Sequence, residues 1–125
     1  MNFNENQVIY LQIADHIIDQ ILLNKWKQDE KIPSVRDLAA ELQVNPNTVM
    51  RAYDYLQQKE ILFNKRGVGN HVSPDAEERI LQIRKEQFLK TQLPLLFRNM
   101  YLLNIRVEEL EKLYSDFVNK NFNPR

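Results

Sequence analysis

The chain gathers amide, hydroxyl and guanidinium side chains around a proline. Asn45 precedes Pro46, and Asn47, Thr48 and Arg51 follow it. An Asn amide can form two hydrogen bonds with adenine and an Arg can do so with guanine, while a Thr hydroxyl can reach a phosphate or touch the thymine methyl group. These residue types at this spacing are suited to contact with the major groove of a DNA duplex.

Apolar residues lie between these polar ones at helical spacing, so the segment is predicted to be a helix over about residues 46–58. Asn45 can cap this helix, and Pro46 suits its first position because no amide hydrogen is needed there. The inward side chains are Val49, Ala52, Tyr53 and Leu56. The outward side would then carry Asn47, Thr48, Met50, Arg51, Asp54 and Tyr55.

Two amphipathic segments precede this helix and are expected to hold its apolar side. Isoleucines and neighbouring apolar residues predict a first helix over about residues 7–23, and Asn24 suits a left-handed end. A second, short helix is predicted over about residues 35–42. Ser34 can cap it, with Asp37 three positions later.

A β-hairpin and further helices follow. Strand-forming residues with glycines between them predict a hairpin over about residues 61–72. Ser73 and Pro74 can then open another helix, which Pro94 should bend or end. The apolar pattern resumes after Pro94, and Asn104 is the expected stop before the last helix. A last helix is predicted over residues 107–118, with its apolar side inside: Val107, Leu110, Leu113, Tyr114 and Phe117.

The predicted fold is mainly α. Two short helices, a tight turn and a hairpin make a winged helix-turn-helix, which we expect to be a DNA-binding domain over residues 1–73. A helical region, residues 74–125, follows it. A major groove about 12 Å wide admits one helix, and the segment from Pro46 is the expected recognition helix.

These motifs together resemble the GntR family of bacterial transcription regulators over residues 8–73. The stretches that carry the resemblance are PSVRDLA (33–39), VNPNTV (44–49), RAY (51–53) and GVG (67–69). The short tail resembles that of the YtrA-type subfamily, whose members carry a two-helix dimerisation region. With the cations beside the hairpin turn, the candidate DNA-binding residues are Ser34, Arg36, Asn45, Asn47, Thr48, Arg51, Lys65, Arg66, Gly67 and Gly69.

Three positions depart from the family pattern. Gln43 stands in the turn between the two helices, where the family usually has glycine, and would cost on the order of 1 kcal/mol if a positive φ is needed. Glu60 also replaces a common glycine. Met50 stands where some members place a contacting Arg, so Arg51 is expected to take over that role.

Each candidate contact has a structural alternative. Arg36 has Asp37 and Glu41 nearby as ion-pair partners, and Arg51 has Asp54 three residues on. Other polar candidates could instead cap a helix, keep the hairpin soluble or pack on the surface, namely Asn47, Thr48, Lys65, Arg66 and Tyr55.

The net charge is zero, with 17 Lys and Arg against 17 Asp and Glu, and residues 1–73 hold 8 and 9 of them. DNA binding therefore needs cations arranged on one face, and a winged-helix module for protein contacts without DNA binding stays open as the alternative. The chain has no cysteine and only His16 and His71, which are interpreted as surface or capping residues. No metal site, cofactor or enzymatic activity is predicted.

The tail is too apolar for two helices alone in water. It packs either on the winged domain or, as we expect, on the same surface of a second subunit. The candidate dimerisation residues are Phe88, Leu89, Leu93, Leu96, Phe97, Met100 and Tyr101. A two-fold dimer would set two recognition helices about 34 Å apart, one turn of DNA, and predicts a near-palindromic operator.

The sequence thus predicts a homodimeric transcription repressor. Neither a signal peptide nor a membrane-spanning segment is visible, so a cytoplasmic location is expected. Control by an unknown small-molecule effector is left open.

Overall fold

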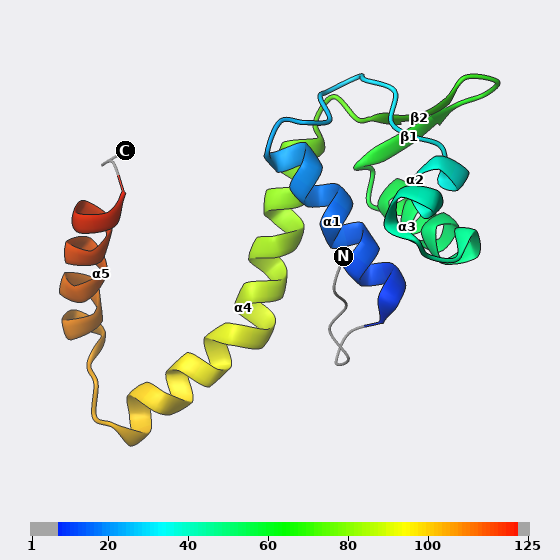
Figure 1. Cartoon of the computed structure of the whole chain (residues 1–125). Coiled ribbons are helices and arrows are strands. Elements are labelled where there is room, and N and C mark those ends of the chain that lie inside the picture. The colour runs from blue at the N-terminus through cyan, green and yellow to red at the C-terminus, as the bar shows by residue number, and fades with distance from the viewer. Residues whose placement is uncertain (1–7, 123–125) are drawn as a thin grey trace. The chain divides into compact units, whose positions relative to one another are not determined.

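The computed structural model describes residues 8–122 (Figure 1). The chain divides into two compact units, Met1–Ile83 and Arg84–Arg125. The described residues are mainly helical and contain one two-stranded antiparallel sheet. The predicted fold class, a winged helix-turn-helix followed by helices, is confirmed.

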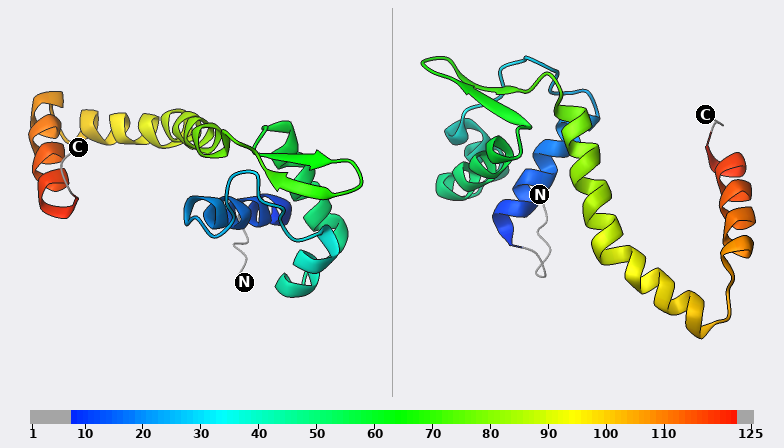
Figure 2. Two further views of the ribbon diagram at one scale, coloured as in Figure 1. Left: turned by 90° about the horizontal axis from the view of Figure 1, so that it is seen from above. Right: turned by 180° about the vertical axis from the view of Figure 1, so that it is seen from behind.

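The first unit contains three helices and the hairpin, which extends away from the helices in both views of Figure 2. The elements in chain order are α1 (Ile9–Leu22), α2 (Val35–Leu42), α3 (Pro46–Gln58), β1 (Leu62–Lys65) and β2 (Gly69–Val72). Leu62 pairs with Val72 and Lys65 with Gly69, which places the turn at residues 66–68. The predicted bounds of α2 and α3 are confirmed.

Side-chain caps begin the two short helices as predicted. The Asp37 N–H donates to Ser34 Oγ at 3.1 Å at the start of α2. The Asn47 N–H donates to Asn45 Oδ1 at 2.8 Å at the start of α3, where Pro46 occupies the first turn. Each cap satisfies an amide that the helix itself leaves without an acceptor.

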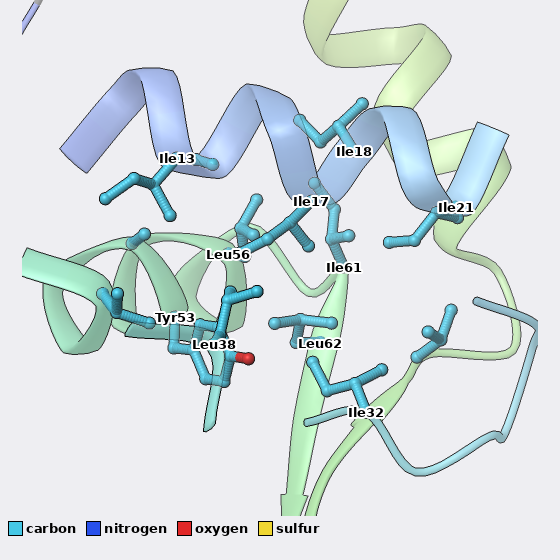
Figure 3. Close-up of a cluster of buried hydrophobic side chains, with 14 of the residues drawn as sticks. Ile13, Ile17, Ile18, Ile21, Ile32, Leu38, Tyr53, Leu56, Ile61 and Leu62 are labelled. Carbon is cyan, nitrogen blue, oxygen red and sulfur yellow. The ribbon is translucent and has the colours of Figure 1, made fainter. Parts of the chain in front are cut away.

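The core of the first unit lies between α1, α3 and the base of the hairpin (Figure 3). Ile13 and Ile17 of α1 and Leu56 of α3 are fully buried there. Tyr53 is buried too, and its hydroxyl donates to the Pro33 carbonyl at 2.7 Å. That bond fixes the loop before α2 against α3, and burial followed by the nearby carboxylates raises the pKa of Tyr53.

Several helices end at a residue with a left-handed backbone conformation. Asn24, Gln43 and Asn104 have φ values of 63°, 57° and 56°. The expected stops at Asn24 and Asn104 are confirmed, and Gln43 does adopt the positive φ that its position was suspected to require. Glu60, also noted as standing where the family has glycine, has φ of 61°.

A segment before α2 pairs with β2 along the edge of the hairpin, and this pairing was not predicted from the sequence. Lys31 forms an isolated antiparallel bridge with His71. The Ile32 N–H donates to the Asn70 carbonyl at 2.9 Å, and the Val72 N–H donates to the Glu30 carbonyl at 3.1 Å. The hairpin is therefore joined by backbone hydrogen bonds to the loop between α1 and α2.

The interpretation of His71 as a surface or capping residue was wrong. Its side chain is buried and stacks on Phe63, with 5.3 Å between ring centroids. Its Nδ1 lies 2.9 Å from the Gly69 carbonyl, which can only accept, so Nδ1 carries the hydrogen. Val72 points into the core cluster and successive strand residues point to opposite faces, so His71 is buried on the other face of the hairpin, against Phe63.

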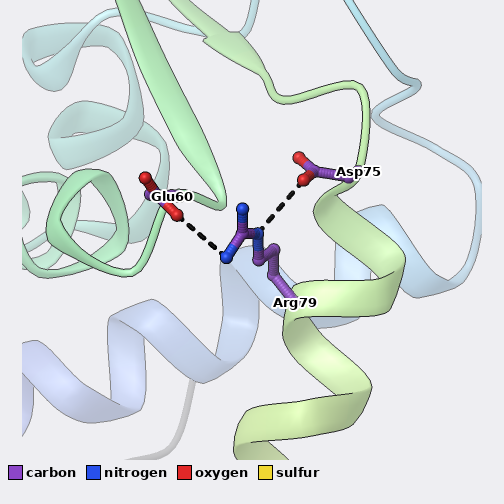
Figure 4. Close-up of polar contacts among 3 residues, drawn as sticks. All are labelled: Glu60, Asp75 and Arg79. Atoms are coloured by element: carbon purple, nitrogen blue, oxygen red, sulfur yellow. Dashed lines mark hydrogen bonds and ion pairs between the residues drawn. The ribbon is translucent and has the colours of Figure 1, made fainter.

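The first unit includes the start of α4 (Ala76–Leu102), since Ala76 and Ile80 are buried in its core. Arg79 lies between two carboxylates, 2.9 Å from Glu60 and 3.1 Å from Asp75 (Figure 4). Through Arg79 the first turns of α4 are tied to the turn after α3. The compact unit thus extends beyond the hairpin end at Ser73, where the sequence analysis set the domain boundary.

The second unit contains the rest of α4 and α5 (Val107–Asn121). Helix α4 continues through Pro94, so the expectation that Pro94 could end the helix was wrong. Pro94 is exposed, and water can satisfy the carbonyl that the missing amide leaves without a donor. No helix within residues 8–122 is both long and apolar enough to cross a membrane.

Apolar side chains of the second unit face solvent. Helix α5 has no buried residue, and α4 and α5 diverge from the turn that joins them in Figures 1 and 2. The residues of α5 predicted to lie inside are exposed or half-buried in this single chain. Tyr101 is 83% exposed, whereas Met100 is buried at 6%. Of the candidate dimerisation residues, Met100 is thus covered within its own chain.

Candidate nucleic-acid interface

Helix α3 carries an exposed polar side. Asn47, Met50, Arg51 and Asp54 are exposed, while Thr48 and Tyr55 are half-buried. The opposite side of α3 packs into the core through Val49, Ala52, Tyr53 and Leu56. The amphipathic pattern read from the sequence therefore has the predicted orientation except at Tyr55, which was expected to face outward and packs against the core.

The first turn of α3 separates the role of Asn45 from that of Asn47. The Asn45 side chain accepts the cap hydrogen bond, so this oxygen is already engaged. Asn47 supplies its backbone N–H to that bond, and its exposed side-chain amide has no hydrogen bond within residues 8–122. The cap thus leaves the Asn47 amide available for a base edge or a phosphate.

Arg36 lies in the first turn of α2 and is exposed. Within the described part of the chain it forms no ion pair with Asp37 or Glu41, the two partners considered from the sequence. Ser34 is exposed as well, with its oxygen accepting the α2 cap. The start of α2 therefore presents a cation without a neutralising partner.

Arg51 has a partner that the sequence analysis did not identify. Its Cζ lies 4.3 Å from the centroid of the Tyr10 ring in α1. Tyr55 meets the same ring edge-on, with 6.2 Å between centroids. Among the described residues no ion pair joins Arg51 to Asp54, so that alternative is not realised. The segments are far apart in sequence, and only their packing reveals the contact.

The wing tip is short and cationic. Lys65 ends β1 opposite Gly69, and the Val68 N–H donates to the Lys65 carbonyl at 2.9 Å, closing the turn. Gly67 has φ of 79°, which favours glycine. Lys65 and Arg66 are both exposed. The end of β1 and the turn after it thus hold two exposed cations at the far end of the hairpin.

Lys31 adds a third cation to the wing. Gly69 has φ of 128°, and a Cβ built there would lie 3.2 Å from Lys31 Cε. The Lys31 side chain therefore passes close to the hairpin backbone, where a larger residue than glycine would crowd it. The bridge between Lys31 and His71 depends on tertiary pairing, which left no signal in the sequence.

An amide network joins α3 to the wing. Gln57 Nε2 donates to Asn70 Oδ1 at 2.6 Å, and Asn64 Nδ2 donates to the same oxygen at 3.4 Å. Gln57 lies in the last turn of α3, whereas Asn64 and Asn70 face each other in the hairpin. These bonds constrain the hairpin relative to the helix that carries Asn47 and Arg51.

The chain matches the family described as "Bacterial regulatory proteins, gntR family" over residues 9–72. It is similar to the HTH-type transcriptional repressor YtrA of Bacillus subtilis (strain 168). The two are 33% identical over 104 residues, which span 83% of this chain and 79% of YtrA.

Solved structures of similar fold include a protein of the GntR family from Bacteroides thetaiotaomicron. It is 48% identical, has a TM-score of 0.81 and is matched over 90% of this chain and 98% of its own. The DNA-binding domain of AraR in complex with operator ORR3 is 25% identical with a TM-score of 0.53. That match covers 58% of this chain and 88% of the AraR domain.

Proposed function

This chain belongs to the GntR family of bacterial DNA-binding transcription regulators, and from that premise we propose that it is a homodimeric repressor of a near-palindromic operator. YtrA, which the chain resembles over most of its length, is described as a repressor. AraR, whose DNA-binding domain has a similar fold, is described in a complex with an operator. A cytoplasmic location, where the bacterial chromosome lies, follows from the proposal.

The exposed side of α3 carries this proposal. Asn47 and Arg51 lie four residues apart on the helix and so share one side. Arg36 at the start of α2 would contact the phosphate backbone, and Asn47 would contact a base edge. The wing cations Lys65 and Arg66 would reach the backbone beside the groove, with Gly67 and Gly69 allowing a tight tip.

The exposed apolar surface of the second unit supports the dimer. Leu96 of α4 and residues of α5 line one apolar groove, namely Val107, Leu110, Leu113, Tyr114 and Phe117. Phe88, Leu89 and Phe97 are exposed as well, at 52%, 46% and 55%. Exposed apolar surface of this kind marks an interaction site, and a two-fold partner would cover it with the same residues.

In such a dimer the two copies of α3 would enter successive major grooves on one side of the duplex. Half-sites would then be one helical turn apart, about 34 Å, and related by a two-fold axis. Repression would follow when the bound dimer blocks a promoter. An effector could release it only by binding more tightly to the arrangement that does not fit the half-sites.

The test selects bound duplexes from a random pool with the wild-type chain, then measures affinity for Arg36→Ala and Asn47→Ala. Each substitution should cost about 1–3 kcal/mol of binding free energy. Arg36→Ala should weaken all sequences alike, and Asn47→Ala should also relax sequence preference. Affinity should fall steeply with salt, with a slope that tracks the phosphates neutralised.

Lys25→Ala is the matched control, because it removes an exposed cation just beyond α1 and outside the proposed interface. It should leave affinity and salt slope unchanged. If both Arg36→Ala and Asn47→Ala bind DNA like wild type, α2 and α3 do not form the contact face. If the wild-type chain binds a protein but does not bind DNA at low salt, the result would favour a protein-contact module instead.

A further inference from the structure

We propose that Tyr10 is a positioning residue: its ring holds the Arg51 guanidinium ready for a phosphate of the operator. The proposal rests on the proposed function, since it assigns a role within the same interface. Tyr10 belongs to α1, which has no place in the contact face read from the sequence. The arrangement makes α1 contribute to DNA affinity through Arg51.

The contact joins two helices that are already fixed by the core. Tyr10 lies in the first turn of α1, is half-buried and packs against the core cluster. Tyr55, one turn after Arg51 on α3, meets the Tyr10 ring edge-on at 6.2 Å. The core cluster and Tyr55 thus both contact the Tyr10 ring, and Arg51 Cζ lies over its face, 4.3 Å from the centroid.

A cation held by a ring keeps its hydrogen-bond donors available. The face of the Tyr ring attracts the guanidinium through its quadrupole and occupies none of the guanidinium N–H donors. Within residues 8–122 no hydrogen bond or ion pair occupies the Arg51 donors, and the side chain remains exposed. The planar guanidinium can therefore still form two parallel bonds to a phosphate.

The stack also reduces the entropy that binding must remove. A free Arg side chain samples many rotamers, and ordering it on a phosphate lowers affinity. Because the Tyr10 ring already restricts the Arg51 side chain, part of this entropy is lost when the chain folds and not when it binds DNA. Asp54, the nearby carboxylate on α3, makes no ion pair with Arg51 and so does not neutralise it.

The experiment is a double-mutant cycle on a duplex selected by the wild-type chain, with fluorescence anisotropy measured from roughly 50 to 200 mM salt. Tyr10→Leu keeps apolar bulk and removes the ring. It should lower affinity about threefold to tenfold, the range expected for losing a cation–π contact. Tyr10→Phe keeps the ring and should bind like wild type.

The coupling identifies the role of Tyr10. Arg51→Ala should lower affinity and reduce the salt slope by about one, as expected for one lost phosphate contact. Tyr10→Leu combined with Arg51→Ala should bind no more weakly than Arg51→Ala alone, because the ring acts only through that side chain. Thermal unfolding of each variant separates lost contacts from lost folding.

Three results overturn the inference. Independent effects of Tyr10→Leu and Arg51→Ala that multiply in the double variant would mean that Tyr10 does not act through Arg51. A loss in Tyr10→Phe equal to that in Tyr10→Leu would assign the role to the hydroxyl. Failure of the wild-type chain to bind any selected duplex would overturn the proposed function itself, whereas the first two results leave it standing.

Discussion

At the scale of single residues, Gln43 and Glu60 are two of the five non-glycine residues within residues 8–122 that have a left-handed backbone. Gln43 ends α2 at φ of 57° and Glu60 follows α3 at φ of 61°. A side chain with a Cβ costs roughly 1–2 kcal/mol there. Both positions adjoin elements of the proposed interface, because Gln43 lies in the turn before α3 and Glu60 leads into the hairpin.

Gln43→Gly should therefore stabilise the protein. Glycine relieves the strain at Gln43 but gains freedom in the unfolded chain, so we expect a net increase of about 0.5–1 kcal/mol in unfolding free energy. Chemical denaturation measures it. Gln43→Ala keeps the Cβ and should bring no comparable gain, while Glu60→Gly should gain less because it gives up the Arg79 ion pair. A destabilised Gln43→Gly would show that its side chain contributes more than its backbone costs.

The sequence predicted residues whose role is local. The caps at Ser34 and Asn45 and the left-handed ends at Asn24 and Asn104 follow from chemistry within a few positions, and all are confirmed. The Tyr10–Arg51 contact could not be predicted, since it exists only because α1 packs on α3. The burial of His71 could not be predicted either, because it depends on contacts with Phe63 and on the bridge to Lys31.

At the scale of elements, the wing is connected to the rest of the first unit on two sides. Backbone bonds tie β2 to the loop at residues 29–32, and Gln57 ties the hairpin to α3. Helix bounds were readable because apolar residues repeat at helical spacing. The segment at residues 29–32 that pairs with β2 has no such repeat. The sequence pattern around Pro94 also does not show that this residue is exposed to solvent, and α4 continues through it.

Asn70→Ala should loosen the wing. It removes the acceptor of the 2.6 Å bond from Gln57 and leaves that half-buried amide without its partner. We expect a loss of about 1 kcal/mol in unfolding free energy and weaker operator binding, measured by denaturation and gel shift. Asn64→Ala is the control, because its 3.4 Å bond is long and exposed. Equal effects from the two substitutions would argue against a specific role for the bond between Gln57 and Asn70.

At the scale of the whole molecule, the apolar surface of the second unit sets the expected assembly. Leu96→Asp would place a charge in the groove that a second copy is proposed to fill, where burial without a partner is costly. Sedimentation should show a monomer, and operator affinity should fall sharply because each half-site would then bind alone. The circular dichroism of the first unit should be unchanged.

Leu23→Asp is the matched control for this substitution. Leu23 is an equally apolar side chain, 64% exposed, but it lies at the end of α1 in the first unit. It should leave both the assembly and the affinity as in wild type. A dimer that survives Leu96→Asp would move the subunit contact away from the α4–α5 groove.

Helix α4 belongs to both compact units, since it starts in the core of the first and continues into the second. Starting a helix is unfavourable, whereas lengthening one that exists is not. Ala76 and Ile80, anchored in the first core, supply the start. The part of α4 in the second unit therefore extends a helix that begins in the winged domain, and the proposed association would remove less backbone freedom from it than from a segment that folds only on contact.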